Sequence, residues 1–116
     1  MIPNHLALGI DIIDIDRFAQ YTKKNNLFLR NNFSAYELNY CFKFKDAAPH
    51  LAGIFAAKEA VYKALGQKIL QSAIKIAHDQ SGKPLAKLGR HALASVSVSI
   101  SHSHKSAVAV AIKYEL

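Results

Sequence analysis

The clearest alternation of apolar and polar positions lies near the C-terminal end of the chain. In residues 96–101 valine and isoleucine alternate with serine, and in residues 107–112 they alternate with alanine. A period of two is typical of a β-strand, and two such segments joined by a short polar turn form a β-hairpin. The pattern therefore predicts a two-stranded hairpin here.

A third alternating segment, residues 6–13, lies near the N-terminus. In a strand, Leu8, Ile10 and Ile12 would share one face, and Asp11 would lie on the other. A carboxylate in an aliphatic strand is costly to bury unless it is paired, hydrogen-bonded or bound to a metal. An edge strand that leaves Asp11 open to water, or a capping role for Asp11, is the plainer explanation.

Capping signals predict two helices in the first half of the chain. Asp14 or Asp16 would cap a helix through residues 17–24. Ser34 and Glu37 have the Ser-x-x-Glu spacing of a capping box, which marks the start of the second helix.

A further helix is predicted at residues 50–65, where alanine, leucine, lysine and glutamate are frequent and Gly66 suits a left-handed C-terminal cap. On a helical wheel, one apolar arc consists of Leu51, Ile54, Phe55, Val61, Tyr62 and Leu65. Lys58 falls inside this arc, and Glu59 and Lys63 lie beside it, one turn apart. A lysine in an apolar arc needs an anion, a partner or a path to water.

The remaining signals complete an α+β pattern. A turn at residues 79–84 is followed by a short strand at 85–88 and a helical stretch at 89–94. No repeat or linker divides the chain, so we expect one domain, 1–116. Its expected architecture is a small, mainly antiparallel sheet covered by helices.

Composition narrows the class of function. The chain has 15 lysines and arginines against 8 acids, a formal charge of +7, which suggests nucleic acid, a phosphorylated small molecule or an acidic protein as partner. A single cysteine excludes an intrachain disulfide and a cysteine metal cluster. No apolar run approaches the roughly 20 residues that span a bilayer. Residues 1–5 lack the features of a secretory signal, so we expect a cytoplasmic protein without a membrane partner.

Asp11 and Glu59 are candidates for a shared metal site. Two carboxylates, with waters and phosphate oxygens, are a usual ligand set for Mg²⁺. An i,i+4 ion pair with Lys63 is the plainer alternative for Glu59. The chain lacks a glycine-rich phosphate-binding loop, so a phosphate ligand would need cationic side chains. Lys58, Lys63 and Lys68 are the candidates for these contacts. A solvated lysine face is the alternative.

Serine and histidine near the hairpin turn suggest further chemistry. His102 and His104 have the spacing of a metal-binding pair, but a zinc site normally takes at least three protein ligands. Hydrogen bonding to phosphate suits this turn as well. Ser101, His102 and Asp11 form a nucleophilic set in principle, yet no nucleophile elbow is present and the serines fit alternating strand positions.

Four short segments occur in a characteristic order and spacing. They are GIDIIDIDRF at 9–18, FAAKEAVYKALG at 55–66, GKP at 82–84 and SISH at 99–102. Together they resemble the holo-acyl-carrier-protein synthase family of 4′-phosphopantetheinyl transferases, over nearly the whole chain. The first segment alone is a weak signal, whereas its combination with the Lys-Glu-Ala helix and the Ser-His hairpin is strong.

This resemblance implies transfer of phosphopantetheine from coenzyme A to a serine of an acyl carrier protein, with release of 3′,5′-ADP, in fatty acid biosynthesis. It implies that Asp11 and Glu59 bind Mg²⁺, which bridges to the pyrophosphate, and that Lys63 stabilises the leaving diphosphate. Asp11, Glu59 and Lys63 are then the catalytic residues. The group that takes the proton from the serine stays open between a metal-bound water, Glu59 and another residue.

The resemblance also implies binding residues and an assembly. The residues that would contact coenzyme A are Lys58, Lys63, Ser101 and His102. Arg17, Lys23 and Lys24 would meet the acidic recognition helix of the carrier protein, where a plain solvated face is the alternative. Similar enzymes are homotrimers with active sites between subunits, so we expect a homotrimer.

Two positions depart from the family pattern. Related sequences usually carry arginine where this chain has Pro49 and Ile54, and these arginines contact the 3′-phosphate of coenzyme A. Lys43, Lys45 or His50 are the candidate replacements.

A small basic nucleic-acid-binding domain is the alternative from another class. It would explain the charge, but no aromatic-rich strand resembles an RNA-binding sheet and no DNA-binding motif is present. A structural module would leave the placement of Asp11, Glu59 and Lys58 unexplained. We therefore expect no nucleic-acid partner.

Overall fold

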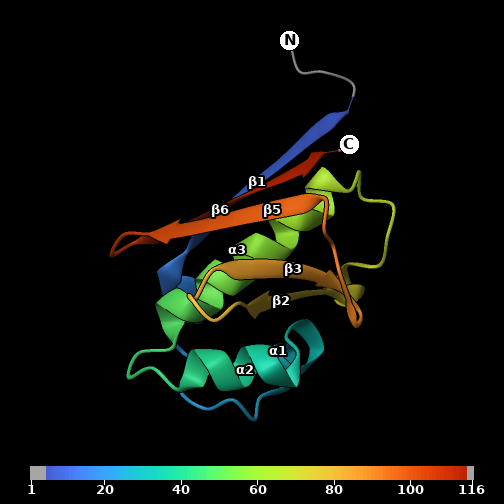
Figure 1. Cartoon of the computed structure of the whole chain (residues 1–116). Coiled ribbons are helices and arrows are strands. Elements are labelled where there is room, and N and C mark those ends of the chain that lie inside the picture. The colour runs from blue at the N-terminus through green and yellow to red at the C-terminus, as the bar shows by residue number, and fades with distance from the viewer. Residues whose placement is uncertain (1–4, 115–116) are drawn as a thin grey trace.

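A computed structural model describes residues 5–114 of the chain (Figure 1). Its helices are the 3₁₀ helix η1 (Ile15–Phe18), α1 (Leu27–Asn32), α2 (Ala35–Phe42), α3 (Ala48–Ala64) and the 3₁₀ helix η2 (Gln71–Ala73). Its strands are β1 (Leu6–Asp14), β2 (Ile74–His78), β3 (Pro84–Leu88), β4 (His91–Ala92), β5 (Val96–His102) and β6 (Ser106–Tyr114). This combination confirms the predicted α+β class.

The long helix α3 lies between two antiparallel sheets (Figure 1). The first sheet has the strand order β1-β6-β5, and the second has the order β2-β3-β4. The predicted architecture of small antiparallel sheet and covering helices is confirmed, and the structure adds that the strands form two sheets. The strands divide because β2, β3 and β4 follow one another through short connections and pair only with their neighbours along the chain.

Small residues let α3 approach the first sheet closely. Ala107, Ala109 and Ala111 of β6 are buried beneath the helix. A Cβ atom at Gly9 of β1 would lie 1.9 Å from the backbone oxygen of Ala60 on α3, so only glycine fits this position. Glycine at position 9 therefore brings β1, and with it the neighbouring Asp11, against the helix.

The opposite face of the first sheet is apolar and exposed. Leu8, Ile10 and Ile12 of β1 have exposed fractions of 51%, 63% and 66%. The register pairs Ile10 with Val110 of β6, which continues this face across the sheet. The alternation predicted for β1 is confirmed, and α3 covers one face of this sheet.

Two of the three predicted helix caps are confirmed. Ser34 Oγ accepts a hydrogen bond from the Glu37 backbone N–H, and Glu37 Oε1 accepts one from the Ser34 N–H, which completes the capping box. At the end of α3, Gly66 has a φ of +74° and its N–H donates to the Lys63 oxygen. The first turn of α3 contains Pro49, where the missing N–H is tolerated.

Two predicted helices are wrong. Instead of a helix through residues 17–24, only the single turn η1 forms, and Asp14 at its start makes no capping hydrogen bond through its side chain. Phe18 is fully buried there, with its ring 5.6 Å from that of Phe55, so packing of Phe18 and not a helical cap anchors this segment. Residues 89–94 contain a turn at Gly89, with a φ of +61°, and the short strand β4.

Helix α1 was not predicted. It begins after Asn26, whose side chain accepts a hydrogen bond from the Leu29 N–H. A helix of this length has weak periodicity, and its stability comes from packing. Within residues 5–114, the helices are all too short or too polar to cross a membrane.

Candidate active site

Asp11 lies on the face of β1 that packs against α3. Lys63 Nζ lies 3.4 Å from Asp11 Oδ1 and donates to the backbone oxygen of Ile10 at 3.0 Å. The second carboxylate oxygen, Oδ2, is buried and lacks a hydrogen-bond partner within the described part of the chain. A buried carboxylate oxygen without a partner is unfavourable, and a bound cation would satisfy it. This atom therefore fits the metal ligand that the sequence predicted.

Glu59 lies one turn before Lys63 on α3 and accepts a hydrogen bond from the side-chain amide of Gln71. Among residues 5–114, Glu59 forms no ion pair with Lys63, which turns to Asp11 instead. Asp11, Glu59 and Lys63 thus gather on one side of the helix. Gln71 was missed by sequence reasoning, because it follows α3 in a segment without periodic signal.

A Mg²⁺ site that is completed by phosphate and water ligands typically takes one or two carboxylates from the protein. Within the described ranges, no three histidine, cysteine, aspartate or glutamate side chains are grouped to hold a metal ion by themselves. This agrees with a site that substrate oxygens complete, and it disfavours zinc, which normally takes three protein ligands. Asp11 and Glu59 therefore fit Mg²⁺ as the pair that would hold it.

Lys58 forms a buried ion pair on another side of α3. Its Nζ lies 2.8 Å from Glu37 Oε1 and donates to the backbone oxygen of Asn32 at 2.9 Å. The Glu37 carboxylate also accepts hydrogen bonds from the backbone N–H groups of Ser34 and Ile76. The anion that Lys58 needs in its apolar arc is therefore Glu37, and a contact between Lys58 and phosphate stays a prediction. Sequence reasoning missed this pair because Glu37 had already been assigned to its cap.

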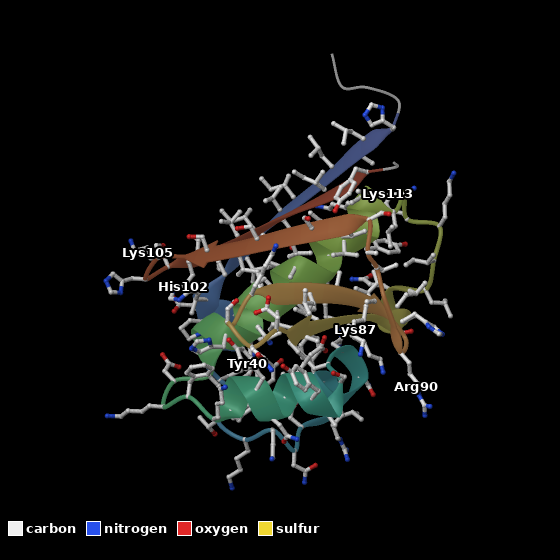
Figure 2. All side chains as sticks on the ribbon, viewed as in Figure 1. Tyr40, Lys87, Arg90, His102, Lys105 and Lys113 are labelled. Atoms are coloured by element: carbon white, nitrogen blue, oxygen red, sulfur yellow. The ribbon has the colours of Figure 1, made fainter. Side chains whose placement is uncertain are left out.

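A pocket of about 200 Å³ opens where the first half of α3 meets β5 and the second sheet. Three histidines line it, His50, His78 and His102, together with Pro49 and Ile54. Figure 2 shows His102 at the end of β5 and Tyr40, another lining residue, on α2. Pro49 and Ile54, the positions where the resemblance implied arginine, thus border the same pocket as His102. Ser101 is exposed on the neighbouring position of β5.

Aromatic rings pack against two of these histidines. The ring centroids of Tyr40 and His78 are 3.9 Å apart, and those of Phe44 and His50 are 3.6 Å apart, both in stacked geometry. Burial lowers the pKa of His50, and the neighbouring His102 lowers it further. Burial also lowers the pKa of His78. Both imidazoles are therefore held toward the neutral form.

The pocket and the Asp11 group lie on opposite sides of α3. His50 and Glu59 are nine residues apart, which is two and a half turns of an α-helix, so their side chains leave the helix in opposite directions. None of Asp11, Glu59 and Lys63 lines the pocket. Within one chain, His102 and Asp11 therefore do not meet, which rules out a Ser-His-Asp set formed by Ser101, His102 and Asp11 of the same chain.

The predicted carrier-protein contacts follow β1 directly along the chain. The Arg17 guanidinium lies 5.1 Å from the centroid of the Phe55 ring, and Lys24 Nζ donates to Asn39 Oδ1 at 2.7 Å. Lys23 is exposed. Their role toward a partner stays a prediction.

Comparisons with known proteins identify the family. The family model of the 4′-phosphopantetheinyl transferase superfamily matches residues 7–112. A holo-[acyl-carrier-protein] synthase of Trichlorobacter lovleyi is 43% identical over 93 residues, which cover 76% of this chain and 74% of that protein. One from Clostridium tetani is 37% identical over 94 residues, covering 78% and 75% of the two chains.

Solved structures agree with this family. A crystal structure of a holo-(acyl-carrier-protein) synthase from Bacillus anthracis in complex with CoA (3′,5′-ADP) has a TM-score of 0.77 and 30% identity, and covers 95% of this chain and 96% of that one. The enzyme from Helicobacter pylori in complex with coenzyme A has a TM-score of 0.72 and 33% identity, and covers 90% and 96%. The protein therefore belongs to the 4′-phosphopantetheinyl transferase superfamily.

Proposed function

We propose that this protein is a holo-[acyl-carrier-protein] synthase that moves phosphopantetheine from coenzyme A to a serine of an apo acyl carrier protein. Curated relatives with this activity cover three quarters of the chain, and related structures contain coenzyme A. The observation that carries the proposal is the buried Asp11 Oδ2, which lacks a partner beside Lys63 and Glu59. A dependence on Mg²⁺ follows from this atom.

In the reaction, the serine oxygen bonds to the β-phosphorus of coenzyme A, and the bond from this phosphorus to the bridging oxygen breaks. 3′,5′-ADP leaves with the electron pair. Mg²⁺ held by Asp11 and Glu59 would stabilise the negative charge that develops on the phosphate oxygens. The Lys63 ammonium, next to Asp11, stabilises the negative charge on the leaving 5′-phosphate of 3′,5′-ADP. Gln71 orients the Glu59 carboxylate, and the acceptor of the serine proton is left unassigned.

The active site is completed by a second copy of the chain in a homotrimer. The Asp11 group and the histidine-lined pocket lie on opposite sides of α3, so one coenzyme A molecule spans both only if another subunit supplies one of them. The exposed apolar face of β1 and β6 is the surface on which copies would pack, because an apolar face of this kind is unfavourable in water.

Substitution of Ile12 by Glu tests this assembly. Ile12 is 66% exposed on that face, and a charge there would oppose association. We expect light scattering after gel filtration to show a trimer for the wild type and a smaller species for Ile12→Glu. Leu27→Glu, at an equally exposed position on α1, is the matched control and should leave the mass unchanged. A monomeric wild type would contradict the homotrimer.

The carrier protein would dock near the start of the chain. Arg17, Lys23 and Lys24 follow the strand that carries Asp11, so an acidic helix bound to them would bring its serine toward that carboxylate. The formal charge of +7 supports an acidic partner. In this proposal the reaction takes place in the cytoplasm, where the protein meets coenzyme A and the carrier protein.

The decisive experiment is intact mass spectrometry of an apo acyl carrier protein incubated with coenzyme A, Mg²⁺ and this protein. The carrier should gain the mass of one phosphopantetheine group, and chelation of the metal should prevent the gain. Glu59→Gln should abolish most of the turnover with an unchanged circular dichroism spectrum. No mass gain in the presence of folded protein and Mg²⁺ would contradict the proposed function.

A further inference from the structure

The end of α1, the start of α2, the middle of α3 and the edge strand β2 enclose a cavity of about 230 Å³. Three cationic side chains line it, Arg30, Lys58 and Lys75, together with the hydroxyl-bearing residues Ser34 and Ser72. Within residues 5–114, no aspartate or glutamate belongs to this lining. The cavity therefore gathers positive charge and hydrogen-bond donors from four elements.

This cavity is separate from the two sites described above. A smaller cavity of about 100 Å³ adjoins it at Ser72 and extends to Gln71. None of Asp11, Glu59 and Lys63 lines either cavity, and the histidine-lined pocket shares no residue with them. A ligand of this cavity is thus distinct from the proposed metal ion and from a ligand of the histidine-lined pocket.

Only one of the three cations is neutralised by the described part of the chain. Lys58 pairs with Glu37, which is itself buried. Arg30 and Lys75 are both exposed, and neither lies within ion-pair distance of a carboxylate in residues 5–114. The charges of Arg30 and Lys75 therefore remain uncompensated at one cavity.

Lys75 also lies opposite a like charge. Its direct cross-strand partner is Lys87 of β3 (Figure 2). Like charges directly opposite each other destabilise a sheet. The one acid in residues 74–92 is Asp79, and its carboxylate already accepts hydrogen bonds within its own turn. An anion bound beside Lys75 would offset this repulsion, which nothing in the second sheet itself offsets.

A phosphate group suits this lining better than an anion of single charge. The guanidinium of Arg30 presents N–H groups in a fork that matches phosphate oxygens, and Lys75 supplies a point charge. Ser34 Oγ accepts the hydrogen bond of the Glu37 N–H, so its own hydrogen is available to donate. A phosphate group carries up to two negative charges and three acceptor oxygens, so it satisfies both cations and a hydroxyl at once.

We propose that this cavity is an anion site that binds a dianionic phosphate group between Arg30 and Lys75. The inference goes beyond the proposed function and does not depend on it, because binding alone is measured. Inorganic phosphate and the phosphomonoester of a small metabolite offer the same oxygens and charge. Two probes distinguish these sources.

Thermal unfolding of the full-length protein at pH 8 tests the proposal, with inorganic phosphate and ribose 5-phosphate as probes and sodium chloride holding the ionic strength constant. Two charge-assisted contacts correspond to a Kd on the order of 1 mM. A ligand that binds only the folded state raises the midpoint of unfolding, by about 3 °C or more at about 10 mM phosphate. Isothermal titration calorimetry measures each Kd. The probe with the lower Kd identifies the source.

Matched variants locate the effect. Arg30→Gln and Lys75→Gln should each raise the Kd by about tenfold or more and reduce the rise of the midpoint to less than about half. Lys87→Gln is the control, because it removes the same charge opposite Lys75 without altering the lining. Its Kd should stay within about twofold of the wild-type value, since salt screens a charge outside the cavity.

The same measurements show whether the variants fold. Without phosphate, Lys75→Gln and Lys87→Gln should each unfold at or above the wild-type temperature, because each removes the repulsion between the two lysines. A response to phosphate that is lost in Lys75→Gln under these conditions is therefore a loss of binding and not of the fold.

Three results would overturn the anion site. They are an unchanged midpoint of the wild type in phosphate, a full response in the double variant Arg30→Gln with Lys75→Gln, and an equal loss of response in Lys87→Gln. Titration with coenzyme A checks that the site is separate, and the double variant should keep a Kd within about twofold of the wild type. A parallel loss of phosphate and coenzyme A binding would contradict a separate site.

Discussion

Two lysines of α3 each pair with a carboxylate, and the two pairs differ in burial and completeness. In the Lys58–Glu37 pair the charged atoms are 2.8 Å apart and the side chains are 8% and 0% exposed. In the Lys63–Asp11 pair they are 3.4 Å apart and the side chains are 43% and 17% exposed. Both oxygens of Glu37 accept hydrogen bonds, whereas Asp11 Oδ2 has no partner in the described residues.

This difference separates a structural pair from the proposed binding site on the same helix. The Glu37 carboxylate accepts hydrogen bonds from groups at the start of α2, in the middle of α3 and on β2. Both of its oxygens are therefore satisfied within the fold. Asp11 Oδ2 has no hydrogen-bond partner among the described residues, and the Asp11 side chain is only partly exposed to solvent. Both pairs join a lysine to a carboxylate, and the unsatisfied oxygen of Asp11 distinguishes the proposed site.

The largest expected effect is on stability, from Lys58→Met. Removal of this ammonium leaves the Glu37 charge buried without its partner, which destabilises a protein by about 3–5 kcal/mol. Urea unfolding followed by circular dichroism measures the change. The double variant Glu37→Gln with Lys58→Met should be less destabilised than Lys58→Met alone, because no buried charge remains. A stable but inactive Lys58→Met would instead assign Lys58 to the cofactor phosphates.

The second effect is on catalysis, from Asp11→Asn. We expect kcat to fall by about 100-fold or more, a size typical for the loss of one preorganised electrostatic contact. The midpoint of thermal unfolding should change little, because the carboxylate is incompletely satisfied in the fold. Asp14→Asn, at an exposed position on the same strand, serves as the control and should keep its activity. Equal losses of turnover and stability in Asp11→Asn would mean that Asp11 is structural.

The smallest expected effect is the change in stability from Lys63→Met. Because the Lys63 side chain is nearly half exposed, solvent screens its pair with Asp11, and the pair contributes at most about 1 kcal/mol to the free energy of unfolding. Turnover should still fall, since the leaving 5′-phosphate of 3′,5′-ADP loses its cation. Urea unfolding and steady-state kinetics measure the two quantities. A loss of stability as large as that of Lys58→Met would remove the distinction between the pairs.

Much of the local structure was predictable, because its signals lie in neighbouring residues. The alternation of residues 96–101 and 107–112 predicted β5 and β6, and Ser34 with Glu37 predicted the start of α2. The failures occurred where long-range packing replaced local signals. Around Phe18, burial against Phe55 anchors a single 3₁₀ turn in place of a helix.

The candidate site was predictable only in part. Asp11, Glu59 and Lys63 were identified from their motifs, and the structure brings them to one side of α3. Gln71 was not predicted, because its contact with Glu59 depends on how the chain returns after Gly66. The separation of His102 from Asp11 was not predicted either, since a motif contains no information on which side of a helix a distant strand will pack.

The sequence by itself determined the periods of the strands, the start of α2, the end of α3, the basic charge and the family resemblance. These properties depend on residues close together in the chain or on composition. Only the tertiary structure decided that Lys58 is neutralised by Glu37, that three histidines share one pocket, and that this pocket and Asp11 lie on opposite sides of α3. Side chains 21 or more residues apart meet only after the helices and sheets have packed, so the placement of each charge is a property of the fold. For the helix that carries Lys58, Glu59 and Lys63, packing therefore separates a lysine that pairs within the fold from the residues of the proposed site.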